Sequence, residues 1–170
     1  RLLFITIVTM AVGQTLVFAL LPLIGRAGGL GELQVGVIIT ASSAVYALAT
    51  RVWGRRSDHL GRRRVILIGL AGYTVGTLVF TSLFWLGFET VLRGLMLWTA
   101  LIVARCLQSS VMAGTMPAAS AYISDITHAG NRTVGIARLG AANSTGTILG
   151  PALGGLLAGT GMLILFRHRA

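Results

Sequence analysis

The sequence predicts an all-α fold, a polytopic bundle of transmembrane helices. Of its 170 residues, 55% are hydrophobic and only 11% are charged, and the mean hydropathy of +0.84 lies far outside the range of ordinary soluble domains. Several apolar runs also reach the roughly 20 residues that a helix needs to cross a hydrocarbon core about 30 Å thick. Lipid offers the backbone no hydrogen-bond partners, so these runs should be helices, which satisfy their own backbone groups.

Five runs are long enough to cross a membrane, and a sixth, at the end of the chain, is not. A signal peptide is an alternative for the first run, but the run is too long for a signal peptide's apolar region and lacks a persuasive small-residue cleavage site. The apolar stretch 162–166 is too short to span, so we expect an interrupted sixth helix and a chain truncated within a larger bundle. The expected spans are residues 2–24, 33–53, 65–86, 95–123 and 134–157, which form one partial amino-terminal transmembrane domain over residues 1–170.

The arginines indicate how the chain crosses the membrane. The expected loop after the second span holds five of the 14 arginines, and Arg132 lies in the loop after the fourth, whereas the two intervening loops hold one arginine each. The positive-inside bias then places the arginine-rich loops and the amino terminus in the cytoplasm. We therefore expect a multi-pass protein of a bacterial inner membrane or a plasma membrane, with the lipid bilayer as its surroundings.

Several function classes are not expected. The formal net charge of +10 is explained by membrane topology, and without a soluble basic domain no nucleic-acid partner is expected. Cys106 is the single cysteine, which excludes an internal disulfide and a multi-cysteine zinc site and leaves packing as its expected role. The three histidines lie in loops or in the tail, away from any serine within a span, so we expect neither an enzyme nor a metal or other cofactor.

Arg105 lies in the middle part of the fourth expected span, where an arginine costs about 2.5–3.5 kcal/mol to insert. It should therefore face a cavity or a partner instead of lipid. Gln108, Ser109 and Met112 follow at helical spacing and share its face. Two interpretations stay open, because this face either ties two helices together by internal hydrogen bonds or lines a pathway for a substrate or protons. The groups expected to face it from the first span are Gln14 and Thr15, for which simple helix packing is an equal alternative.

The fifth expected span combines regularly spaced glycines with a proline. Gly146, Gly150 and Gly154 leave one face without side chains, so that another helix can approach closely. Pro151 removes a helical hydrogen bond and should bend or loosen the helix there. Small residues at this spacing are common wherever membrane helices pack, and the proline makes the segment more distinctive. Pro117 is expected to kink the fourth span in the same way.

Four motifs follow one another along the chain. Residues 54–63 read GRRSDHLGRR, Arg105 is followed three positions later by Gln108, and Asp125 is followed seven positions later by Arg132. The fourth motif contains Gly146, Gly150, Pro151, Gly154 and Gly155. In their order and places these motifs resemble those of the major facilitator superfamily of secondary transporters. The fourth resembles the motif of antiporters, particularly drug/proton exchangers of the multidrug and tetracycline efflux type.

The resemblance implies a transporter in which two six-helix halves rock around a central site, as in other transporters built from repeats. This chain would supply most of the amino-terminal half and would require the missing carboxy-terminal half to export a small-molecule substrate. By the same resemblance, Asp58 would join Arg62 and Arg132 in a cytoplasmic charge network that locks the inner gate. The remaining residues of the expected gate motif are Gly54, Gly61, Arg63 and Asp125, with the glycines allowing a tight turn.

The other arginines of this loop have a simpler interpretation. We expect Arg55, Arg56, Arg63 and Arg64 to contact anionic lipid headgroups, each contributing about 1 kcal/mol, because a positive-inside loop needs nothing more.

Proton coupling through Arg105 is also implied by the resemblance, but the sequence departs from the superfamily in two respects. Ser109 stands where the fourth-helix motif usually has glycine, and all four acidic residues lie at or beyond the ends of the expected spans. A coupling carboxylate would then come from the missing half, or Arg105 would bind an anionic substrate directly. The alternative to a transporter is an inactive truncated fragment or a non-transporting membrane scaffold, because alternating access requires both halves.

Overall fold

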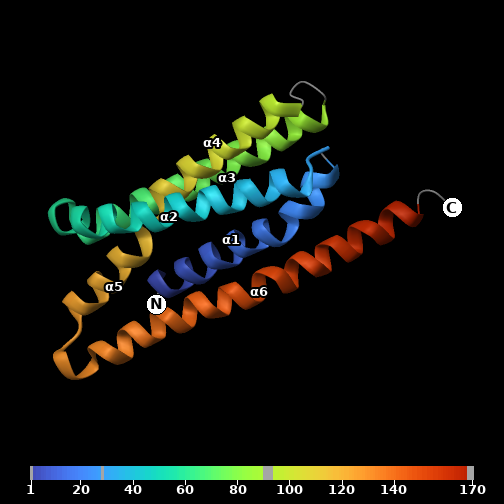
Figure 1. The fold of residues 1–170 in the computed structure, drawn as a ribbon. Coiled ribbons are helices and arrows are strands. Elements are labelled where there is room, and N and C mark those ends of the chain that lie inside the picture. Colours follow the sequence, from blue (N-terminus) through green and yellow to red (C-terminus); the bar gives the residue numbers. More distant parts are fainter. Residues whose placement is uncertain (1, 28, 90–93, 168–170) are drawn as a thin grey trace. The chain divides into compact units, whose positions relative to one another are not determined.

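Long helices dominate the computed structural model, which describes residues 2–27, 29–89 and 94–167 (Figure 1). All regular secondary structure in these ranges is helical, so the all-α prediction is confirmed. The expected loop position of Arg93 and the tail residues 168–170 lie outside the described residues. The helices are α1 (Leu2–Ala27), α2 (Glu32–Leu60), α3 (Arg62–Phe88), α4 (Gly94–Met112), α5 (Thr115–Ile126) and α6 (Arg132–Arg167), with a 3-10 turn at Ala129–Asn131 before α6.

Four stretches of the described residues are long and apolar enough to cross a membrane, and they match the first four expected spans. Many of their large apolar side chains are exposed, including Leu33 at 87% and Trp85 at 68%. Such surfaces are unfavourable in water and are accommodated by lipid. The fifth expected span, residues 134–157, lies within α6. The four stretches are Leu2–Arg26, Glu32–Leu60, Arg62–Gly87 and Gly94–Ile126.

The second helix extends further than the sequence predicted. A loop was expected after Trp53, but α2 continues through the arginine-rich segment to Leu60. Polar residues end a membrane span without ending a helix, and residues 55–60 contain neither glycine nor proline. The connection to α3 is the single residue Gly61, whose φ of +89° lies in a region that glycine adopts readily. The expected loop is therefore a helical corner.

The fourth expected span is divided into two helices. α4 ends at Met112 and α5 begins at Thr115, with Ala113 and Gly114 between them. Pro117 explains the break, because proline has no N–H to donate to the carbonyl of Ala113 and its ring crowds that carbonyl. The kink expected from Pro117 is thus present as a break just before the proline.

The last helix is longer than the fifth expected span. α6 is continuous from Arg132 to Arg167, so residues 162–166 belong to it and the expected interrupted sixth helix is not a separate element. Pro151 lies inside α6 and does not end it. Membrane helices tolerate proline where neighbouring groups satisfy the freed carbonyl.

The chain divides into two units, of which unit 1 comprises Arg1–Ile24 and Ala137–Ala170. Within it, α1 and α6 run in the same direction, because successive glycines of α6 lie against successive turns of α1 (Figure 1). Gly146 lies against Ala11, and Gly150 lies against Thr15. The Thr15 hydroxyl donates to the Ala11 carbonyl at 2.7 Å and also lies 3.2 Å from the Gly146 carbonyl. The close helix approach predicted from these glycines is observed, with α1 as the partner.

Unit 2 comprises Gly25–Ile136, and in it α4 packs against both α2 and α3, while α5 packs against α3 (Figure 1). Ile38 and Leu101 are fully buried at the centre of this packing. Two tryptophans add hydrogen bonds between helices. The indole N–H of Trp53 donates to the Ser110 carbonyl at 2.6 Å, and that of Trp98 donates to the Gln34 carbonyl at 3.0 Å. Such bonds anchor α4 to α2 at two levels along the helices.

Candidate functional site

A group of charged side chains lies at the corner between α2 and α3. The Arg62 guanidinium pairs with Asp58 at 2.5 Å through Nη1 and with Asp125 at 3.3 Å through Nε. Nη1 also donates to the Ser57 hydroxyl at 2.7 Å. One arginine at the start of α3 is thus held by groups from α2 and α5. We call Ser57, Asp58, Arg62 and Asp125 the Arg62 cluster.

Local structure explains why these groups meet. The single-residue corner at Gly61 places Arg62 beside the end of α2, four positions after Asp58. Ser57 is 1% exposed, and its hydroxyl donates in turn to the Gly54 carbonyl at 2.8 Å. The buried hydroxyl therefore fixes the position of the guanidinium, which lets it bind two carboxylates from different helices.

The ion pairs of the Arg62 cluster are accessible to water. The side chains of Asp58 and Asp125 are 57% and 58% exposed, and that of Arg62 is 25% exposed. Exposed ion pairs typically contribute about 0.2–1 kcal/mol each because water screens them and the side chains lose freedom. The cluster is consequently easy to break and re-form.

The other expected members of the gate motif lie apart from these ion pairs. Arg132 begins α6 and is exposed, and in the described part of the chain it makes no ion pair. Asp125, which was expected only as part of the motif, binds Arg62 directly. Gly54 lies inside α2 and contributes its carbonyl to Ser57. Arg63 is exposed next to the cluster.

A second group of polar side chains forms the buried face of α4. Arg105, Gln108 and Ser109 are 1–2% exposed, and Met112 is 7% exposed, so the shared face predicted from their spacing is observed. Arg105 Nη1 donates to Gln108 Oε1 at 2.5 Å, and the guanidinium carbon lies 5.4 Å from the centre of the Phe80 ring. A cation at this distance from an aromatic face is stabilised by the ring.

Gln108 also connects α4 to α3. Its Nε2 donates to the Tyr73 carbonyl at 3.1 Å and to the Thr77 hydroxyl at 2.8 Å. The interhelical tie that was left open for this face is therefore present at Gln108, and it orients the amide oxygen toward Arg105. Gln14 and Thr15 belong to unit 1, and their expected position opposite this face stays a prediction.

Three glycines of α3, which were not predicted from the sequence, make this contact possible. A Cβ atom at Gly76 would lie only 2.5 Å from Cγ of Gln108, and one at Gly72 or Gly69 would collide with Val111 or Thr115. α3 can thus approach α4 and α5 only because these positions lack side chains. Their spacing of three and four residues places them on one face of a helix, as the spacing of four does for the glycines of α6, and this signal could have been found in the third expected span.

Among the described residues, no group of three or more histidine, cysteine, aspartate or glutamate side chains could hold a metal ion. The arrangement instead offers an accessible ion-pair cluster at the α2–α3 corner and a buried cation held by an amide and a ring. Neither contains a nucleophile with an adjacent base.

Known transport and resistance proteins are similar to the chain. Residues 2–166 match the family model described as Major Facilitator Superfamily. The chain is 33% identical over 135 residues to a triacylglyceride transporter of Mycolicibacterium smegmatis, covering 79% of the chain and 21% of that protein. It is 29% identical over 154 residues to Multidrug resistance protein 2 of Bacillus subtilis, covering 91% and 36%. It is 35% identical over 153 residues to the class G tetracycline resistance protein of Vibrio anguillarum, covering 88% and 35%. The chain therefore spans between about a fifth and about a third of the length of these relatives.

Proposed function

The chain belongs to the major facilitator superfamily, and from that premise we propose that it supplies helices of a secondary transporter that exports small molecules across a cell membrane. Its relatives include proteins named for multidrug and tetracycline resistance, which supports a drug-like organic substrate. Alternating access needs two halves that move against each other. In this proposal the chain therefore works together with a second set of helices, and protons are the candidate coupling ion.

The Arg62 cluster carries the proposal. A single guanidinium joins the ends of α2, α3 and α5, so any movement that separates these ends must break its ion pairs. Two exposed pairs together contribute about 0.4–2 kcal/mol, which changes the ratio of closed to open states by a factor of about 2–30. This is strong enough to bias a gate and weak enough to let it reopen. We assign the cluster as a latch on the cytoplasmic side.

Replacing Asp58 with asparagine should lower the initial rate of export by about 1.4–5-fold, because it removes one of the two ion pairs of the latch, worth about 0.2–1 kcal/mol, without changing side-chain size. The measurement is efflux of ethidium and of tetracycline from a pump-deficient bacterial host that expresses the complete coding sequence. The amount of protein in the membrane should be unchanged. The matched control is Glu32→Gln, which removes the carboxylate of another exposed pair, Arg26–Glu32 at 2.5 Å, in a different loop.

Three outcomes of this experiment are informative. Wild-type efflux in the Asp58→Asn variant would rule out the latch. An equal loss of export in Glu32→Gln would show that removing any exposed ion pair slows export, and that the α2–α3 corner has no distinct role. If the wild-type protein exports nothing from a broad compound panel, the export proposal fails, and the non-transporting scaffold is favoured.

The amino terminus and the arginine-rich corner should lie in the cytoplasm, because loops rich in arginine are retained there. Reporters fused after His59 and after Glu89 test this orientation. A reporter active only in the cytoplasm should give signal after His59 and none after Glu89. Cytoplasmic signal from both positions would contradict the alternating arrangement of α2 and α3.

A further inference from the structure

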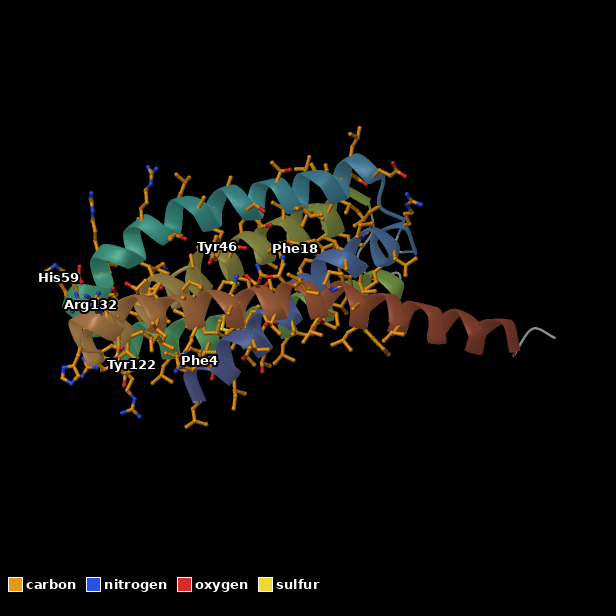
Figure 2. All side chains as sticks on the ribbon, turned by 90° about the horizontal axis from the view of Figure 1, so that it is seen from below. Phe4, Phe18, Tyr46, His59, Tyr122 and Arg132 are labelled. Atoms are coloured by element: carbon orange, nitrogen blue, oxygen red, sulfur yellow. The ribbon has the colours of Figure 1, made fainter. Side chains whose placement is uncertain are left out.

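An open pocket of about 510 Å³ lies at the arginine-rich corner, beside the Arg62 cluster. Residues 60–64 form one side of it, and Tyr122, Asp125 and Ile126 of α5 form the other. Figure 2 shows Tyr122 at the same end of unit 2 as His59, close to the corner. All of the lining residues belong to unit 2. The pocket thus lies between the ends of α2, α3 and α5, three helices of one unit that contact one another.

The charge of this pocket suits an anion. Its lining contains three arginines, Arg62 to Arg64, and one aspartate, a formal excess of two positive charges. Arg62 is already bound by Asp58 and Asp125. Arg63 and Arg64 are exposed, and neither takes part in an ion pair or a side-chain hydrogen bond within the described ranges. Two guanidinium groups therefore remain available to oxygen atoms from outside the protein, and phosphate oxygens match their geometry well.

The remaining walls of the pocket are apolar and exposed. Leu60 is 44% exposed, Tyr122 is 36% exposed, and Ile126 is 61% exposed. A soluble anion would gain nothing from these surfaces. An amphipathic anion would place its charged part at the arginines and cover the apolar side chains with its hydrocarbon part.

The position of the pocket along the helices points to the source of such an anion. Three of the stretches that can cross a membrane end here, namely Glu32–Leu60 at its last residue, Arg62–Gly87 at its first and Gly94–Ile126 at its last. The expected apolar spans end nearby, at Trp53, Val65 and Ile123, so at about 1.5 Å per residue the pocket lies about 2–10 Å beyond them, on the headgroup side of the hydrocarbon. In the headgroup layer, phospholipids present a phosphate directly above acyl chains.

We propose that this pocket binds one anionic glycerophospholipid. The phosphodiester lies between Arg63 and Arg64, and the first acyl carbons cover Leu60 and Ile126. In this proposal the hydroxyl of Tyr122, which also lines the pocket, donates to a headgroup oxygen, as interfacial tyrosines commonly do. This binding is distinct from a general attraction of the whole basic corner to lipid, and it is measured without transport, so it stands independently of the export proposal.

Arg55 and Arg56 provide the matched control. They are exposed members of the same arginine-rich corner but lie outside the pocket. A diffuse electrostatic attraction would weaken equally when either pair is neutralised, because both changes remove two charges from the same end of the protein. A defined site would weaken only when Arg63 and Arg64 are changed.

The test is native mass spectrometry of the delipidated protein, produced from its complete coding sequence in a neutral detergent and titrated with phosphatidylglycerol or with phosphatidylcholine of the same acyl chains. We expect one phosphatidylglycerol to be retained and phosphatidylcholine to bind at least tenfold more weakly. Arg63→Gln combined with Arg64→Gln should weaken retention about 30-fold. Arg55→Gln combined with Arg56→Gln should change it less than threefold.

Several results would overturn the proposal. Equal loss in the two double variants would leave only diffuse attraction, and equal binding of phosphatidylcholine would remove the need for an anion. Displacement of the lipid by millimolar glycerol 3-phosphate would identify a soluble anion as the ligand. If the Arg63 and Arg64 double variant is not recovered from membranes, Ile126→Glu serves instead, since it places a carboxylate on the apolar wall. Unchanged retention in that variant would also contradict the site.

Discussion

Replacing Arg105 with methionine should lower transport by about 10–100-fold while the protein remains folded in the membrane. Loss of a charge-assisted hydrogen bond to a bound group typically costs about 1.5–3 kcal/mol, which corresponds to that range of rates. The expectation follows from the burial of Arg105, which is 1% exposed in a stretch that can cross a membrane. A charge kept in such a place is more often functional than structural.

Two opposing effects should leave the stability of this variant nearly unchanged. A central arginine costs about 2.5–3.5 kcal/mol to insert, and the variant no longer carries this cost. Against this, Gln108 Oε1 loses its donor, at a cost of about 1–3 kcal/mol. Methionine fills a similar volume, and its sulfur packs well against an aromatic ring such as Phe80. The thermal midpoint in detergent should therefore move by only a few degrees.

Measuring both transport and thermal stability of the Arg105→Met variant decides between the two interpretations of the buried face of α4. If Arg105 chiefly ties helices together, Arg105→Met should unfold the protein at a clearly lower temperature, and any loss of transport would follow from that. If it acts on a substrate or on coupling, transport should fall at unchanged stability. Leu107→Met is the control on the same helix, because Leu107 is 62% exposed and should affect neither quantity. Normal transport by Arg105→Met would contradict the functional interpretation.

The membrane spans could be read from the sequence because hydrophobic length is a property of each segment alone. The helix ends could not be read in the same way. Composition placed the end of the second span at Trp53, yet α2 continues to Leu60 because arginine, serine and histidine are compatible with a helix in water. In contrast, Pro117 acts through covalent geometry, and its effect on the fourth span was predictable.

The candidate site was predictable only where its residues are close in sequence. Asp58 and Arg62 are four positions apart, and their pairing across the corner was expected. The pairing of Arg62 with Asp125 joins residues 63 positions apart and depends on how α5 packs against α3. The sequence resemblance named Arg132 as a further partner, and no ion pair of Arg132 occurs in the part of the chain that the structure describes. Which side chain completes an ion pair depends on packing distances that one sequence does not contain.

Gly150→Ala is expected to have the largest effect on stability, a loss of about 1–3 kcal/mol from overpacking between α1 and α6. A Cβ atom at Gly150 would collide with the Thr15 hydroxyl and would lie 2.8 Å from the Val12 carbonyl oxygen and 2.9 Å from the Leu16 nitrogen. Side chains can rotate away, but these backbone atoms can move only if the two helices separate. The measurement is the thermal midpoint of the detergent-solubilised protein, which should fall by several degrees.

Gly155→Ala supplies a control in the same helix with the opposite expected sign. Apart from the adjacent turns of α6 itself, no atom of the described residues lies within 4 Å of a Cβ built there, so alanine should stabilise the helix by about 0.5–1 kcal/mol through its better helix propensity. A second variant separates the two sources of the collision. Adding Thr15→Ala to Gly150→Ala removes the hydroxyl but leaves both backbone contacts, so it should not restore the midpoint. Full recovery in that double variant, or equal midpoints for the two alanine variants, would show that α1 and α6 do not depend on a glycine-lined contact.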